Sequence, residues 1–157
     1  TRGPQILIGS SMGGWLMMLA AKSRPKRISG LVGLAAAVDF GKNLFNDLNK
    51  KNKNEIKLKG LTKYSSSGFS YILTKKFFTE ANKNNILKKP FYYRKPIILI
   101  HGLKDKIVRD DMPKKIMKLV KGNNVQILYL KSSDHRLSDV NDLKIINNAI
   151  DSIRRLT

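Results

Sequence analysis

Short apolar runs alternate with amphipathic segments over most of the chain. The first run, Gln5 to Ile8, ends in a turn rich in glycine and serine, and the spacing after it predicts a helix from about Met12 to Lys22. Arg24-Pro25 ends that helix, because a residue before proline disfavours the helical region. The next run, Ile28 to Ala35, has the length and the continuous apolar character of a strand covered on both faces. These segments predict two parallel strands joined by a helix.

The last third of the chain repeats this alternation. Four elements are expected there: a buried strand in PIILIHG from Pro96 to Gly102, a helix from about Met112 to Lys121, a strand from Val125 to Leu130, and an amphipathic helix from Asp139 to Arg155. Strands that alternate with helices are typical of a parallel sheet covered by helices. The sequence therefore predicts an α/β fold with a doubly wound, mostly parallel sheet.

Residues 40–93 have a different character. Asn, Lys and Ser are frequent in this segment, and its apolar residues occur in short groups. We interpret the segment as a mostly helical cap, inserted into a single α/β domain that spans residues 1–157. Its aromatic residues, among them Phe77 and Phe78, either line a substrate pocket or form a small core of the cap itself.

Basic residues greatly outnumber acidic ones. The 157 residues include 31 Lys and Arg against 11 Asp and Glu, which gives a net charge of +20. Such an excess is compatible with a basic module that binds nucleic acid or an anionic surface. The basic residues are scattered rather than interleaved with aromatic ones, and the abundance of Lys, Asn and Ile is what AT-rich coding produces. We therefore expect no nucleic-acid binding, and keep a non-catalytic basic module as an alternative.

Composition also excludes several classes of site. The chain has no cysteine, which excludes disulfides, thiolate metal sites and a cysteine nucleophile, although the redox compartment stays open. Residues 4–21 are uncharged, but their Gly, Ser and Pro content argues against a transmembrane helix. The sequence shows no metal cluster and no nucleotide fingerprint, so it implies no metal and no cofactor. We expect a cytoplasmic location and a small-molecule partner, with the oligomeric state left open.

The turn after the first predicted strand carries a nucleophile motif. Gly9-Ser10-Ser11-Met12-Gly13 matches G-x-S-x-G, and it stands between a buried strand and a helix, as the motif requires. Ser11 is the candidate nucleophile, and the backbone N–H of Met12 is the candidate oxyanion donor. The alternatives are a turn that only packs, or one that binds a phosphate at the helix N-terminus.

A serine nucleophile needs a base and a carboxylate that orients the base. His135 follows the last predicted strand at the sheet edge where α/β proteins keep their sites, whereas His101 is expected to pack or hydrogen-bond at a strand end. Asp105 follows its strand at the same edge and completes the chain order Ser, Asp, His. Three other carboxylates stay as alternatives: Asp110 and Asp111, whose position before a helix suits capping, and Asp134, which adjoins the base in sequence.

In these motifs the sequence resembles the C-terminal part of α/β-hydrolase-fold serine hydrolases. The resemblance is carried by GSSMGGWLMMLAA from Gly9, by PIILIHGLKDKIV from Pro96, and by DHRLS at Asp134 to Ser138 followed by Asp142-Leu143. More narrowly, these segments are similar to bacterial hydrolases related to the mitochondrial palmitoyl-protein thioesterase and acyl-glucuronide esterase. The resemblance implies an ester or thioester hydrolase that acts on a small-molecule or acylated substrate. It also implies Ser11 as nucleophile, Asp105 as acid, His135 as base and the Met12 N–H as one oxyanion donor.

The resemblance also implies a part that this sequence does not contain. Members of the fold have several strands before the nucleophile turn, and a loop after an early strand supplies the second oxyanion donor. We therefore expect the chain to be part of a longer product, with an open sheet edge where the missing strands pair. An inactive hydrolase fragment is accordingly a further alternative to an active serine hydrolase.

Overall fold

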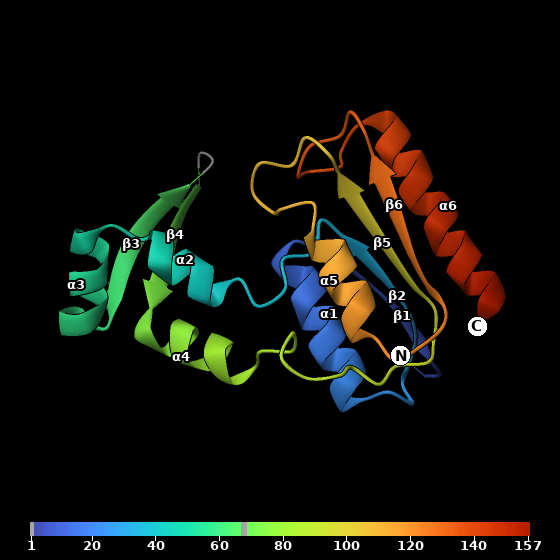
Figure 1. Cartoon of the computed structure of the whole chain (residues 1–157), viewed down its shortest axis with the longest axis horizontal. Helices are drawn as coiled ribbons and strands as arrows, with labels where there is room; N and C mark the ends of the chain where they lie inside the picture. Colours follow the sequence, from blue (N-terminus) through green and yellow to red (C-terminus); the bar gives the residue numbers. More distant parts are fainter. Residues whose placement is uncertain (1, 67–68) are drawn as a thin grey trace. The chain divides into compact units, whose positions relative to one another are not determined.

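The structure of the chain, a computed structural model, describes residues 2–66 and 69–157. Contacts between residues divide it into two units. The first, which we call the sheet unit, consists of Thr1–Val38 together with Ile86–Thr157. The second, which we call the inserted unit, is Asp39–Asn85. The elements of both units are labelled in Figure 1.

The sheet unit is built on a parallel sheet. Its strands are β1 (Gln5–Ser10), β2 (Ile28–Leu34), β5 (Ile97–Gly102) and β6 (Val125–Leu130), in the order β1-β2-β5-β6. Helices α1 (Met12–Ser23) and α5 (Met112–Leu119) cover one face, and α6 (Val140–Leu156) covers the other (Figure 1). The predicted doubly wound parallel sheet is therefore confirmed.

Alternate positions of β2 face opposite helices, as a strand requires. A Cβ atom at Gly33 would lie 3.1 Å from the Cε of Met17 in α1, and one at Gly30 would lie 2.3 Å from the Cγ2 of Ile153 in α6. On the α6 side the core includes Val32, Ile98, Ile100, Ile146, Ala149 and Ile153. Because both faces are covered, the strands read as continuous apolar runs rather than as alternating ones.

The inserted unit combines helices with a hairpin. Its elements are α2 (Gly41–Asp47), α3 (Lys50–Lys59), β3 (Leu61–Ser66), β4 (Phe69–Thr74) and α4 (Lys75–Lys83), with β3 and β4 paired antiparallel. The side chains of Asn49 and Thr74 cap the N-termini of α3 and α4. The unit has its own core, formed by Leu48, Ile56, Leu73 and Phe78, against which Phe77 packs. Phe77 and Phe78 thus contribute to that core.

The inserted segment differs in two respects from what its sequence predicts. The β3–β4 hairpin was not expected, because the apolar groups of this segment, such as Tyr71-Ile72-Leu73, are too short to distinguish a strand from a helix. The inserted unit also ends at Asn85 instead of about residue 93. Beyond it, Phe91 exchanges backbone hydrogen bonds with Leu119 and Lys121, and the Tyr93 hydroxyl donates to the Ile28 carbonyl at 3.2 Å. These bonds join residues 91–93 to the sheet unit.

None of the helices in the described part of the chain is long and apolar enough to cross a membrane.

Candidate active site

Ser11 forms the turn between β1 and α1. Strand β1 ends at Ser10 and α1 begins at Met12, and Ser11 itself has φ 51° and ψ −120°. A positive φ of this kind costs a residue other than glycine about 1–3 kcal/mol, so surrounding bonds must hold it. Its N–H donates to the Leu34 carbonyl at 2.9 Å, and its carbonyl accepts from the N–H groups of Gly14 and Ala37. The turn is therefore fixed to the end of β2, with the Ser11 side chain partly exposed.

Close backbone packing around this turn depends on two glycines. A Cβ atom at Gly9 would lie 2.3 Å from the Gly13 carbonyl oxygen, and one at Gly14 would lie 2.4 Å from the Ala36 Cβ. A Cβ atom at Gly13, the last position of the motif, would meet nothing within 4 Å among the described residues. Gly14 was not singled out from the sequence, although the Gly-Gly pair was its visible signal. Helix α1 thus approaches the sheet through Gly14 rather than through the motif glycine Gly13.

Asp105 lies in the loop after β5, with its side chain fully buried. One carboxylate oxygen, Oδ1, accepts hydrogen bonds from the N–H groups of Ile107 and Val108, at 2.8 and 2.9 Å. The other oxygen, Oδ2, lies 2.8 Å from Nδ1 of His135. Hydrogen bonds to an ionised acceptor are about twice as strong as neutral ones. The loop therefore stabilises a carboxylate that is out of contact with water. Its Oδ2 is nearer to His135 than to His101, whose Nε2 lies 3.8 Å away.

His135 lies between Asp105 and Ser11. Its Nε2 lies 3.1 Å from the Ser11 Oγ, and its side chain is 17% exposed. A carboxylate only accepts hydrogen bonds, so Nδ1 carries a proton and donates it in a hydrogen bond to Asp105. In the neutral ring this leaves Nε2 as an acceptor for the Ser11 hydroxyl. The three side chains follow the carboxyl ends of β1, β5 and β6, the sheet edge at which they were expected. The structure thus joins serine, imidazole and carboxylate by two hydrogen bonds.

The other sequence candidates have different surroundings. His101 is fully buried, and its Nε2–H donates to the Val108 carbonyl, so it hydrogen-bonds at its strand end. Asp134 accepts from the N–H of Arg136 in its own loop. Asp110 accepts the Tyr129 hydroxyl through its carbonyl.

The expectation that Asp111 caps a helix is wrong for its side chain. Asp111 occupies the N-cap position of α5, but its side chain makes no capping hydrogen bond. Its carboxylate instead pairs with Lys115 at 3.1 Å and with Arg109 at 3.5 Å. The hydrogen bond from Lys115, with help from the neighbouring positive charges, holds the pKa of this carboxyl below its usual value.

The Met12 N–H belongs to the first turn of α1, where backbone amides have no intrahelical acceptor. It follows Ser11 directly, so it is placed beside the serine as an oxyanion donor requires. Within the part of the chain that the structure describes, no group of three or more His, Cys, Asp or Glu side chains could hold a metal ion.

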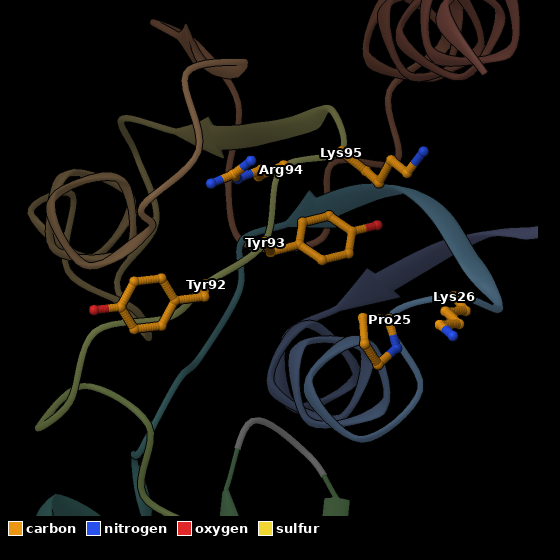
Figure 2. A pocket seen from close by; sticks show the side chains of 6 residues that line it. All are labelled: Pro25, Lys26, Tyr92, Tyr93, Arg94 and Lys95. Atoms are coloured by element: carbon orange, nitrogen blue, oxygen red, sulfur yellow. The ribbon is translucent and has the colours of Figure 1, made fainter.

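A shallow pocket of about 410 Å³ lies elsewhere on the sheet unit. Figure 2 shows the residues that line it: Pro25, Lys26, Tyr92, Tyr93, Arg94 and Lys95. Lys26 precedes β2 and Lys95 precedes β5, so the pocket is at the amino ends of these strands. Ser11 is at the opposite edge of the sheet, and the pocket is therefore separate from the candidate site.

Known proteins resemble this chain in sequence and in fold. No protein-family model matches the chain. The mitochondrial palmitoyl-protein thioesterase ABHD10 of Bos taurus is 38% identical over 155 residues, which cover 96% of this chain and 50% of the bovine protein. The chain spans about half the length of the curated relatives it matches.

Solved structures extend the comparison to the fold. The alpha/beta hydrolase domain-containing protein 10 from mouse superposes with a TM-score of 0.84 at 32% identity, covering 100% of this chain and 64% of the mouse chain. A putative hydrolase from Agrobacterium vitis also gives a TM-score of 0.84, at 26% identity over 94% of this chain and 60% of its own. Parallel sheet, turn geometry and these likenesses together show that the chain has the α/β-hydrolase fold.

Proposed function

We propose that the chain carries the active site of a serine hydrolase that cleaves carboxylic esters or thioesters through an acyl-enzyme. In this proposal Ser11 is the nucleophile, His135 the general base and Asp105 the acid that orients it. The observation that carries the proposal is the pair of hydrogen bonds on one imidazole, at 3.1 Å to Ser11 Oγ and 2.8 Å to Asp105 Oδ2. Residues from three separate strand ends meet there, which supports the proposal, because acyl transfer by a serine uses an imidazole base that a carboxylate orients.

The first half of the reaction acylates the serine. As Ser11 Oγ attacks the carbonyl carbon of the substrate, its proton moves to Nε2 of His135. Asp105 stabilises the imidazolium that forms, and the Met12 N–H donates to the oxyanion of the tetrahedral intermediate. The imidazolium then protonates the departing alcohol or thiol, and the acyl group stays on Ser11.

The second half restores the enzyme. His135 takes a proton from water, whose oxygen attacks the acyl carbon and forms a second tetrahedral intermediate. When that intermediate collapses, the Ser11 oxygen leaves and regains its proton from His135, and the carboxylic acid is released. The name of the relatives, palmitoyl-protein thioesterase, indicates an acylated substrate, and we extend that substrate class to this chain as part of the proposal.

Labelling with a fluorophosphonate tests the proposal directly. Ser11 Oγ would attack phosphorus, fluoride would leave, and the serine proton would pass to His135. We expect one adduct in the intact mass of the chain, mapped to Ser11 by peptide sequencing. Removing the base in His135→Ala is expected to slow labelling at least as much as any change at Asp105, by about 10⁴-fold or more. Asp105→Asn, which favours the wrong imidazole tautomer, is expected to slow it by on the order of 10³ to 10⁴.

The neighbouring serine supplies the matched control. Ser10 is exposed and adjoins Ser11, so Ser10→Ala should leave labelling unchanged while Ser11→Ala abolishes it. Labelling that persists at full rate in folded His135→Ala would contradict the assigned base. A folded chain that takes no label, but binds nucleic acid with a steep salt dependence that survives Ser11→Ala, would instead support the non-catalytic basic module.

A further inference from the structure

A buried carboxylate outside the three proposed catalytic residues lies close to the loop of the base. Asp142 is in the first turn of α6 and is only 5% exposed. Aspartate is almost never buried to this extent unless it is paired, because the charge loses its hydration. Its position in the first turn of α6 offers a partial answer, since a helix N-terminus favours negative charge. The buried carboxylate therefore needs a hydrogen-bond partner, and the position of that partner shows which part of the chain Asp142 holds in place.

The partner is a serine in the loop that carries His135. Ser133 is 9% exposed, and its hydroxyl donates to Asp142 Oδ1 at 2.5 Å. This distance is typical of a charge-assisted O–H···O⁻ bond, the stronger class of hydrogen bond. Removing one partner of such a buried pair leaves the other unsatisfied, which costs more than the bond contributes when both are present.

The backbone of Ser133 is at the same time joined to the loop of Asp105. Its carbonyl accepts the N–H of Lys104, the residue before Asp105, at 3.0 Å. The two loops touch here so closely that a Cβ atom at Gly102 would lie 2.3 Å from that carbonyl oxygen. A single residue, Ser133, thus links the start of α6, the loop of the base and the loop of the acid.

The other side of His135 is fixed by a different contact. Leu137 is buried in the core between the sheet and α6, with a φ of 50°. The imidazole is therefore carried on a short segment between two anchors, one apolar at Leu137 and one polar at Ser133. Only the polar anchor depends on a charge, so it can be removed by an isosteric change.

We infer that Asp142 is a positioning residue for the base: through Ser133 it holds the His135 loop so that Nε2 faces Ser11 while Nδ1 faces Asp105. This role rests on the proposed function, since it matters for catalysis only if His135 is the base. Displacement of a catalytic group by about 1 Å can cost 100-fold in rate. Loss of the Asp142 charge is therefore expected to reach the reaction without touching any reacting atom.

The test uses the full chain, whose two histidines allow each imidazole to be followed separately by nitrogen-15 NMR. Asp142→Asn keeps the size of the side chain and removes its charge. We expect it to shift the imidazole nitrogen signals of His135 more than those of His101, and to slow fluorophosphonate labelling of Ser11 about 10- to 100-fold. Asp151→Asn is the matched control, because Asp151 is an exposed carboxylate on the same helix that pairs with Arg154.

Ser133 provides the second arm of the experiment. Ser133→Ala should shift the His135 signals as Asp142→Asn does. Ser133→Thr keeps the hydroxyl and should restore the wild-type signals. The double variant Ser133→Ala/Asp142→Asn should slow labelling no further than either single change. Folded variants with unchanged His135 signals overturn the inference, as does loss of folding in both single variants. A wild-type chain that takes no label would contradict the proposed function alone, because the imidazole signals still report whether Asp142 holds His135.

Discussion

The two units of the chain are stabilised in different ways. In the sheet unit, central strands are covered on both faces, and three strand ends bring Ser11, Asp105 and His135 together. The inserted unit has a core of Leu48, Ile56, Leu73 and Phe78 and a two-stranded hairpin. The two hydrogen bonds of the proposed site are made within the sheet unit, so its chemistry should be separable from the stability of the inserted unit.

The largest expected effect on stability comes from removing the Phe78 side chain from the core of the inserted unit. Phe78 is 7% exposed and its ring contacts those of Phe45 and Phe77 edge-on, each at 5.1 Å between centroids. Phe78→Ala should destabilise the inserted unit by about 3–5 kcal/mol, because lost burial and a cavity add together. Hydrogen exchange should report this as lost protection in β3 and β4 with protection in β2 and β5 retained. Labelling of Ser11 by a small fluorophosphonate should change less than about twofold.

An aromatic residue at the surface of the same unit serves as the control. Tyr71 is 48% exposed on β4, and Tyr71→Ala should have a small effect on exchange in either unit. If Phe78→Ala removed protection equally from β2 and β5, or abolished labelling, the two units would not be separable.

A smaller effect is expected at the turn of the sheet unit, where adjacent glycines differ. Gly14→Ala places a methyl group against the Ala36 side chain and should destabilise the sheet unit by about 1–3 kcal/mol in urea unfolding. It should also slow Ser11 labelling, because α1 must move away from the turn. Gly13→Ala meets open space among the described residues and gains helix propensity of up to about 1 kcal/mol. Equal destabilisation by the two changes would contradict the packing described here.

The sequence located the strand ends and therefore the candidate residues. Parallel strands end at one edge, so the positions of Ser11, Asp105 and His135 after three apolar runs were enough to expect them together. The boundaries of those runs were also close, because burial on both faces leaves an unbroken apolar signal.

The details that position these side chains were not accessible in this way. The bond from Ser133 to Asp142 links a loop to the helix after it, and the close approach of Gly14 to Ala36 links α1 to the segment after β2. No periodicity of the sequence encodes either of them. The inserted hairpin was missed for another reason, since an apolar group as short as Tyr71-Ile72-Leu73 in β4 does not distinguish a strand from a helix. At Asp111 the sequence predicted the position correctly but not the contact: the residue is at the N-cap of α5, yet its carboxylate pairs with Lys115.

The smallest expected effect is a pH-dependent one at Tyr93 of the sheet unit. The residue is 3% exposed, its hydroxyl donates to the Ile28 carbonyl, and burial raises the pKa of this phenol to about 12. Tyr93→Phe should cost about 1 kcal/mol at neutral pH, the net contribution of a typical hydrogen bond. The unfolded chain ionises this phenol near pH 10. The stability that the buried neutral phenol provides is therefore present below about pH 10 and lost as the pH rises towards 12.

A comparison of wild type with Tyr93→Phe isolates the effect of Tyr93 ionisation on stability, because every other titrating group is common to both. Urea unfolding between pH 9 and 12 should show wild type losing about 2 kcal/mol more than Tyr93→Phe, in proportion to the raised pKa. The additional loss should appear in the exchange of β2, whose first carbonyl receives the hydroxyl, and not in β3 or β4. Parallel pH profiles for wild type and Tyr93→Phe would show that the Tyr93 phenol ionises as readily in the folded chain as in the unfolded one. That result would contradict the expected loss of stability in the sheet unit at high pH.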